Sequence, residues 1–600
     1  MSLHCAAPAR SRATVPVLAW LVVWLCLPWL LQPARAAEPA PPPTLRVELA
    51  APDALRPALE ANLDIMRWAS RGGLTQGQIE QLFAGARKQV REIAATEGYF
   101  DVQVAASLRG EGDSRVARLD VTTGEPVLVR DVQIEFAGPL LQDPQRDTRI
   151  QRARRVFRLA PGERFRQADW DAAKSRALRS ISRKRYGTAT IARSEARIDP
   201  DRGSATLSLT IDSGPPVTMG SPQVVGLQRY EERLVRNLNP IPAGADYDED
   251  ELLKYQRRLL SSGYFGSAIV GSTPNREAPA NTPILVSLTE SPSRRVELGF
   301  GYSTDRQLRA QASYRDNDLF DRAWRLHTSL AVDRYVQELH GGIVFPRRPS
   351  GINYGLESEL RAEDIQGQEI FNWSVTGARQ YLNEEYESAL SLQFLSEHSQ
   401  LDDGPEDNRS ALFLNQRWLW NTLDDPLNPR RGWSFQFQAG GALKGLLTTR
   451  TFGRLHTRAN YLYPFNRQWT LALRGEAGMV LADSRDNIPS AYVFRTGGDT
   501  SIRGYAYESL GVEEANAVVG GRYLLVGSVE LMRWLNRQWG VGVFVDGGNA
   551  WDDLSRFDPV YGYGGGVRWR SPLGNLSLDL ARGEATDEWR VHFSVGIVLR

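Results

Sequence analysis

The stretch RVELGFGY at residues 295–302 decides the fold of the second half of the chain. Every second residue in it is large and apolar, and the residues between are charged or glycine. Side chains of a β-strand point alternately to opposite faces, so one face of this strand is apolar and the other is polar or small. The same alternation returns in SFQFQ (434–438) and VHFSVGIVL (591–599). Strands with an apolar outer face and a polar inner face are typical of a transmembrane β-barrel.

The length of this region predicts the number of strands. About 300 residues at about 19 residues per strand and connection give roughly 16 strands, an even number as expected for bacterial barrels. Aromatic residues gather in WLW (418–420) and YLY (461–463), as they do where strands leave a membrane. A soluble β-sandwich also alternates, but the aromatic strand ends and the leader described next favour a membrane. We therefore predict a transmembrane antiparallel β-barrel of about 16 strands over residues 292–600.

The first 36 residues resemble a secretory signal peptide. A basic start precedes a mostly apolar run at 15–31, and Ala34-Arg35-Ala36 forms a small-x-small cleavage site. The run is short and contains proline, which favours a cleaved leader over a retained anchor, the alternative interpretation. Both cysteines, Cys5 and Cys26, lie in this segment. The mature chain is therefore expected to have no disulfide and no cysteine-ligated metal.

A threefold repeat of about 80 residues fills the region between the leader and the barrel. The segments GYFDVQV (98–104), RYGTATI (185–191) and GYFGSAI (263–269) align. Each follows a segment with helical spacing of apolar residues. The first of these begins with the capping pair Thr75 and Gln78, and the third begins with Asp248 and Glu251. The tyrosines at 99, 186 and 264 are expected to be core residues.

Each repeat closes with two strands and opens with a strand before its helices. Residues 115–121 and 205–211 alternate, and VQIEF (132–136) precedes the second pair of helices. The order is β-α-α-β-β, repeated three times as α+β domains. We place the repeats at 44–125, 126–214 and 215–291. Their order and the GYF signature resemble the POTRA domain, in which exposed strand edges can accept an extended partner chain.

One arginine in the barrel region calls for a partner. The glycine-rich stretch GGDTSIRGY (497–505) carries Arg503, and FVDGGNAW (544–551) carries Asp546. A guanidinium inside a barrel needs a carboxylate, which can accept its planar fork of donors through both oxygens. The alternative is that Arg503 lies in a solvated loop tip.

Four motifs in order, together with the POTRA-like repeats, resemble the BamA superfamily of outer-membrane assembly and secretion barrels. The motifs are DDPLNPRRGW (424–433), GGDTSIRGY (497–505), FVDGGNAW (544–551) and SPLGNLSLDLA (571–581). The resemblance covers residues from about 44 to 600. Three POTRA-like units, rather than five or two, resemble the TamA branch of this superfamily. The chain ends Leu599-Arg600, without the terminal aromatic residue usual in such barrels.

The resemblance implies two sites. In the family the RGY element forms part of a long loop that folds into the lumen, where its arginine meets carboxylates on the wall. Carried over, the lumen latch comprises Arg503, Gly504, Tyr505, Asp546 and Glu530. The family also opens a lateral seam between its first and last strands, which here would involve Val296, Leu298, Gly299, Gly301, Phe593, Gly596 and Leu599.

The resemblance further implies a function and partners. The expected function is insertion, folding or secretion of outer-membrane proteins such as autotransporters, from the bacterial outer membrane with the repeats in the periplasm. The expected partners are a TamB-like inner-membrane-anchored periplasmic protein, unfolded outer-membrane protein substrates and the lipid bilayer. The alternative is a two-partner-secretion transporter pore that exports one dedicated substrate. A passive porin is disfavoured because porins lack periplasmic repeats.

Composition disfavours the other classes. The net charge of +1 argues against nucleic-acid binding, which favours a basic patch. The six histidines show no metal-ligand spacing, and no G-x-S-x-G nucleophile motif has a plausible set of partners. We therefore expect neither an enzyme nor a cofactor.

Overall fold

The computed structural model describes residues 45–71, 73–110, 115–383, 386–404, 406–425, 428–571 and 574–599. The expected signal peptide lies outside these residues. The chain divides into two compact units. The first holds the residues up to Ser182 together with 189–214, and the second holds 183–188 and 215–600. Among the helices of the described ranges, none is long and apolar enough to cross a membrane.

The first repeat is a three-stranded sheet with helices. Its elements are β1 (Leu45–Ala50), α2 (Arg56–Asn62), α3 (Asp64–Ala69), α4 (Gln76–Thr96), β2 (Val102–Arg109) and β3 (Arg115–Thr123). The strand order is β1-β3-β2, with β1 parallel to β3. The predicted capping box is present: the Thr75 hydroxyl accepts from the Gln78 backbone, and the Gln78 side chain accepts from the Thr75 backbone. Gly98 follows this helix with φ of 89°, a conformation that favours glycine.

The second repeat has the same plan. It comprises β4 (Leu128–Ala137), the 3-10 helix η2 (Pro139–Gln142), α5 (Arg146–Phe157), α6 (Gln167–Ser182), β5 (Thr190–Asp199) and β6 (Ser204–Asp212). The strand order is β4-β6-β5. Both repeats thus place the strand that follows the helices at an open edge of the sheet, paired on one side only.

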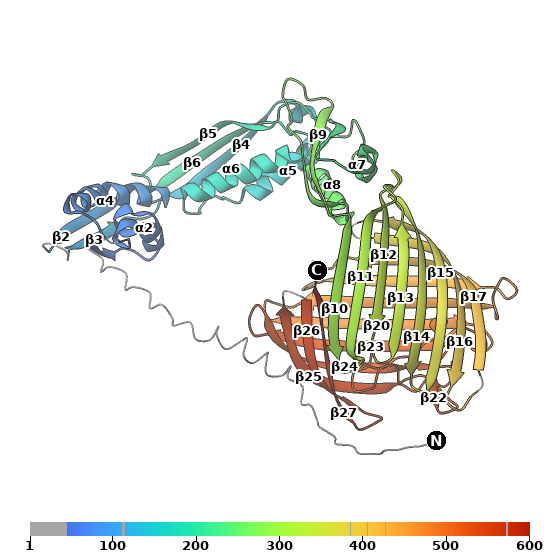
Figure 1. Ribbon diagram of the computed structural model, residues 1–600. Coiled ribbons are helices and arrows are strands. Elements are labelled where there is room, and N and C mark those ends of the chain that lie inside the picture. The colour runs from blue at the N-terminus through green and yellow to red at the C-terminus, as the bar shows by residue number, and fades with distance from the viewer. Residues whose placement is uncertain are drawn as a thin grey trace, which may run out of the picture. The chain divides into compact units, whose positions relative to one another are not determined.

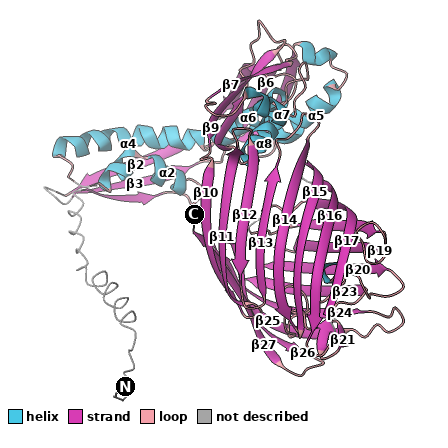
Figure 2. Ribbon diagram, turned by 45° about the vertical axis from the view of Figure 1, so that its right-hand side comes forward, coloured by secondary structure: helices cyan, strands magenta, loops and turns pink. Residues whose placement is uncertain are grey.

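The third repeat belongs to the same unit as the barrel. It comprises β7 (Met219–Val225), α7 (Glu232–Leu238), α8 (Glu249–Ser261), β8 (Phe265–Gly271) and β9 (Thr282–Glu290), in the strand order β7-β9-β8. Asp248 caps α8 through the backbone N–H of Asp250, whereas Glu251 pairs with Lys254 and does not complete a capping box. Figure 2 shows that the helices of the described residues lie in the repeats, apart from short turns of helix in the barrel region.

The aligned tyrosines are core residues, as expected. Tyr99, Tyr186 and Tyr264 are all buried. The hydroxyl of Tyr264 donates to the backbone oxygen of Ala323, in a turn of the barrel, at 2.7 Å. The hydroxyl of Tyr99 accepts from Arg164 of the second repeat at 3.0 Å. In both cases the apolar ring packs in one domain and the polar tip reaches the next.

The second half is a closed antiparallel barrel of 16 strands (Figure 1), which confirms the predicted fold class. Its strands are β10 (Arg294–Ser303), β11 (Gln307–Leu319), β12 (Trp324–Val332), β13 (Val336–Val344), β14 (Ile352–Ile365), β15 (Gln368–Leu382), β16 (Tyr386–Leu401), β17 (Glu406–Asn421), β18 (Gly432–Ala442), β19 (Phe452–Pro464), β20 (Trp469–Leu481), β23 (Tyr523–Trp534), β24 (Trp539–Trp551), β25 (Val560–Ser571), β26 (Gly574–Gly583) and β27 (Trp589–Leu599).

The alternation in the sequence corresponds to the two faces of the barrel wall. On β24, Val541, Val543 and Val545 are exposed, whereas Phe544 and Asp546, at the alternate positions, are buried. An apolar face turned outward suits lipid, and a polar face turned inward allows hydrogen bonding in the lumen. The period of two therefore positions the inward-facing side chains that build the site.

Candidate functional site

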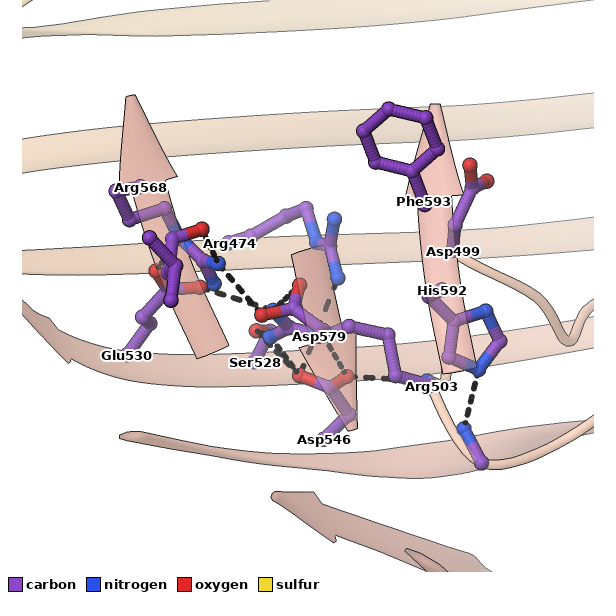
Figure 3. A network of polar contacts seen from close by, with 12 residues as sticks. Arg474, Asp499, Arg503, Ser528, Glu530, Asp546, Arg568, Asp579, His592 and Phe593 are labelled. Atoms are coloured by element: carbon purple, nitrogen blue, oxygen red, sulfur yellow. Dashed lines mark hydrogen bonds and ion pairs between the residues drawn. The ribbon is translucent and has the colours of Figure 1, made fainter. Parts of the chain in front are cut away.

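The longest connection of the barrel, residues 482–522 between β20 and β23, carries Arg503. It includes the 3-10 helix η3 (Ser490–Tyr492) and the short strands β21 (Val512–Glu514) and β22 (Ala517–Val519). Its residues bond inward-facing side chains of the wall, so the connection lies in the lumen, and we call it the lumen loop. Figure 3 shows Arg503 among these wall side chains.

Arg503 is held by Asp546, the carboxylate with which the sequence analysis pairs it. Its Nε and Nη2 donate to the two oxygens of the Asp546 carboxylate at 2.7 and 2.9 Å, and its backbone N–H donates to the same group at 3.0 Å. The Arg503 residue is 5% exposed and Asp546 is 0% exposed. The guanidinium also lies 3.3 Å from the centroid of the Phe544 ring. Arg503 is therefore a fixed residue inside the barrel and not a solvated loop tip.

Glu530 is also a partner, as the resemblance implied. Its carboxylate accepts from Nη1 of Arg503 at 2.9 Å and from Nε of Arg568 at 2.7 Å. Asp579 accepts from the same two arginines, at 3.3 and 2.5 Å. Ser528 donates to Asp546 at 2.6 Å. The strands β23, β24, β25 and β26 thus each contribute at least one polar side chain to one network (Figure 3).

The charges of this network balance. Three carboxylates (Asp546, Glu530 and Asp579) face two arginines directly, and Arg474 lies 3.9 Å from Asp546. Buried charges are tolerated when each is paired and hydrogen-bonded, and removal of one partner leaves another uncompensated. The network therefore specifies one position of the loop against the wall.

Gly504 lets the loop backbone touch the wall. Its φ is 98°, and a Cβ at this position would lie 2.6 Å from the backbone nitrogen of Gly583. Gly562 on β25 completes the fit, because a Cβ there would lie 1.9 Å from the Arg503 carbonyl oxygen. Next along the loop, the Tyr505 hydroxyl donates to the Tyr561 backbone at 3.1 Å. The structure thus brings together all five residues predicted for the lumen latch.

The loop has a second anchor at the opposite part of the wall, which the sequence did not reveal. The Glu397 carboxylate on β16 accepts from the backbone N–H of Ser490 at 2.8 Å and from its hydroxyl at 3.0 Å. Nearby, the Tyr492 ring packs against Phe413 and Phe452, with centroids 4.5 and 5.2 Å apart. The loop is therefore fastened to the wall at two separate points, Ser490 and Arg503.

The seam between β10 and β27 is short. The two strands share six residue pairs, from Leu298 with Leu599 to Ser303 with Ser594, whereas β16 and β17 share fifteen. Of the residues named for the seam, Gly299, Gly301 and Gly596 lie in these pairs. Val296 does not: it precedes the first pair and lies opposite Tyr314 of β11. Phe593 instead lies opposite Leu578 of β26.

The arrangement suits a mechanical role. Among the described residues, no group of histidine, cysteine and acidic side chains could hold a metal ion. The charged groups around Arg503 pair with one another and hold the loop in place. Within the described ranges, the last strand, β27, is paired only over short stretches, with six residue pairs to β10 and five to β26. A junction with few backbone pairs is the place where a closed sheet separates at the smallest cost.

Comparisons with known proteins agree with this architecture. Two curated proteins named outer membrane protein assembly factor BamA are similar to the chain. The protein from Neisseria meningitidis is 22% identical over 84% of this chain and 70% of its own length. The protein from Neorickettsia risticii is 21% identical over 60% of this chain, which spans about half (51%) of that relative.

A solved structure has the same fold. BamA from Haemophilus ducreyi lacking POTRA domains 1–3 aligns with a TM-score of 0.61 and 15% identity, covering 79% of this chain and all of that one. Residues 293–598 match the Omp85 superfamily domain. This match covers half of the chain and includes every barrel residue of the network and all seam residues except Leu599, so the protein belongs to the Omp85 superfamily.

Proposed function

We propose that this protein is the outer-membrane barrel of a translocation and assembly module. It would promote insertion and folding of outer-membrane proteins such as autotransporters. The observation that carries the proposal is the junction of β10 and β27, six residue pairs long, in an Omp85 barrel preceded by three POTRA-like repeats. The relatives from Neisseria and Neorickettsia are named as assembly factors, which supports the same class of activity.

The physical basis of the activity is exchange of strand pairs. A β-strand in lipid must pair its backbone groups, because unpaired N–H and C=O groups are costly there. When β27 leaves β10, the edge of β10 can pair with a strand of an incoming protein. Residues 294–297 of β10 extend beyond the last seam pair, and within the described part of the chain they pair with β11 alone. This free stretch of edge is where an incoming strand would pair first.

The repeats would face the periplasm and bind partners through sheet edges. Each of the three repeat sheets has two edge strands: β1 and β2, β4 and β5, β7 and β8. An extended chain can add to such an edge through main-chain hydrogen bonds. The partner proposed for these edges is a TamB-like protein anchored in the inner membrane. The proposal assigns the chain no enzymatic activity.

The proposal is tested by locking the seam. The purified chain is reconstituted in liposomes, and folding of a urea-denatured autotransporter barrel is followed by its heat-modified migration. The cysteine pair Gly301→Cys/Gly596→Cys joins residues that lie opposite each other in the seam. Folding should be faster than in empty liposomes, should fall to the empty-liposome rate when the pair is oxidised, and should recover on reduction.

The matched control is Gly355→Cys/Ala378→Cys, which joins β14 to β15 away from the seam. Its oxidation should leave the folding rate unchanged. Unimpaired folding with an oxidised seam would contradict the proposal. A protein that conducts ions and exports one soluble substrate, but does not accelerate barrel folding, would instead be a two-partner-secretion pore.

A further inference from the structure

The last strand changes partner in the middle of its length. Trp589–Phe593 of β27 pair with β26, and Ser594–Leu599 pair with β10. At the changeover, the backbone N–H of Thr304 donates to the Phe593 oxygen at 3.0 Å, and the Phe593 N–H donates to the Thr304 hydroxyl at 3.1 Å. The first hairpin of the barrel thus meets the last strand at this point.

His592 occupies the same point and faces the lumen. It is 2% exposed, and its Nε2 accepts a hydrogen bond from the backbone N–H of Gly504 at 2.9 Å (Figure 3). A nitrogen that accepts carries no proton, so the neutral ring holds its proton on Nδ1. Nδ1 lies 3.3 Å from a carboxylate oxygen of Asp305, an electrostatic contact without the alignment of a good hydrogen bond.

Asp305 also contacts the lumen loop. It lies in the turn between β10 and β11, and its second oxygen accepts from the backbone N–H of Asp499 at 2.6 Å. One imidazole therefore joins three parts of the molecule: the loop at Gly504, the last strand that bears it, and the first hairpin. This chain of contacts is separate from the one between Arg503 and Asp546.

We propose that His592 is a positioning residue that couples the lumen loop to the lateral seam. Movement of β27 away from β10 takes the acceptor from Gly504 and the neighbouring ring from Asp305. Movement of the loop out of the lumen takes the Gly504 N–H away from the His592 ring and the Asp499 N–H away from the Asp305 carboxylate. Opening of the seam therefore destabilises the docked loop, and release of the loop destabilises the closed seam. The two events are linked, and the linkage is reciprocal.

This inference deepens the proposed function and rests on it for the meaning of the seam, but its test needs no substrate. The full chain is placed in lipid nanodiscs with Gly301→Cys/Gly596→Cys, in a background where Cys5 and Cys26, the two cysteines of the sequence, are replaced by serine. Opposed strand residues lie within the range of a disulfide. Hydrogen exchange of the peptide covering 497–506 is measured with the seam oxidised and reduced.

Oxidation should slow hydrogen exchange of this peptide by about 5-fold or more, because coupling between two sites typically changes an equilibrium by at least that factor. In His592→Phe, which has no acceptor for Gly504, oxidation should have no effect. His592→Gln, whose amide oxygen can accept the same N–H, should recover part of the response. The matched control is His456→Phe, which removes another lumenal imidazole, bonded to Glu476 at 2.8 Å, and should respond as the parent does.

Equal slowing in the parent and in His592→Phe would overturn the proposal, as would the absence of slowing in the parent. If His592→Phe fails to show the heat-modified migration of a folded barrel, Asp305→Ala carries the test, and an undiminished response there overturns the proposal. Loss of assembly activity with the coupling intact would contradict the proposed function alone.

Discussion

Arg503 and Asp546 form a two-pronged ion pair across 43 positions of the sequence, with both residues almost completely buried. The arginine belongs to the lumen loop and the aspartate to strand β24 of the wall. The pair therefore fixes the loop to the wall. Since the aspartate also accepts the arginine's own backbone N–H, it holds both the side chain and the course of the loop.

Arg503→Ala should destabilise the barrel by roughly 3–5 kcal/mol, the cost of leaving a buried carboxylate without its partner. Asp546 and Glu530 would each lose a direct ion pair. The change in the free energy of unfolding is measured by urea titration, with the folded fraction read from heat-modified migration on a gel. Arg503→Lys should rescue little, because an ammonium lacks the planar fork that both oxygens of Asp546 accept.

The control for this change is Arg556→Ala. The side chain of Arg556 is 84% exposed and pairs with Asp553 on the surface, where ion pairs contribute about 0–1 kcal/mol. A loss in Arg503→Ala no greater than in this control would show that the latch does not stabilise the barrel.

Gly504→Ala should displace the loop. The residue has a φ of 98°, and its new Cβ would lie 2.6 Å from backbone at Gly583, which cannot move as a flexible side chain can. Destabilisation above about 1 kcal/mol is expected from the backbone conformation alone. Hydrogen exchange over 497–506 should rise. Gly475→Ala is the control, since nothing lies within 4 Å of its added Cβ, and a rise in both variants would contradict the explanation.

The strands and repeats could be predicted from the sequence because they follow local periods. Alternation fixes which side chains face the lumen, and so His592 and Asp579 are recognisable as inward-facing residues. Their partners are not, because the contact of Arg568 with Asp579 depends on the register between β25 and β26. The anchor of Ser490 on Glu397 joins residues 93 positions apart through the path of a loop.

The sequence also does not show that β27 changes its pairing partner after Phe593. The sequence alternates between apolar residues and polar or small residues on both sides of Phe593, from Val591 to Ile597, and so carries no mark of the partner change. What differs is which neighbour each half pairs with, and that is set by closure of the whole barrel. The motifs of the family resemblance therefore point to residues that the structure brings together, Arg503 and Asp546, whereas the contact between His592 and Gly504 emerges only from the three-dimensional arrangement.

Glu397→Gln should loosen the second anchor of the loop and leave the first in place. The buried carboxylate accepts three hydrogen bonds from Ser490, and a hydrogen bond to a charged group contributes about 1.5–3 kcal/mol. Exchange of the peptide covering 486–494 should rise, while that of 497–506 stays near the parent value. An equal rise in both peptides would mean that the loop is released as one piece and has no independent anchors.

Glu290 should make the junction of the third repeat and the barrel sensitive to acid. Burial alone would raise the pKa of this carboxyl, but backbone N–H groups of Gln228, Arg229 and Tyr230 and the Arg229 side chain donate to it and lower its pKa below the ordinary value. A depressed folded-state pKa contributes stability that is present above the unfolded-state pKa, about 4.3, and is lost as the pH falls through the folded-state pKa.

Hydrogen exchange of residues 226–236, corrected for the intrinsic rate, measures this contribution between pH 7 and pH 3. Protection should fall with acid in the parent, and in Glu290→Gln it should be low and nearly independent of pH. This segment contacts the barrel, because the Tyr230 hydroxyl donates to the Asn317 backbone oxygen at 3.4 Å. The exposed Glu277, replaced by glutamine, is the control, and parent-like protection in Glu290→Gln at pH 7 would refute the assignment.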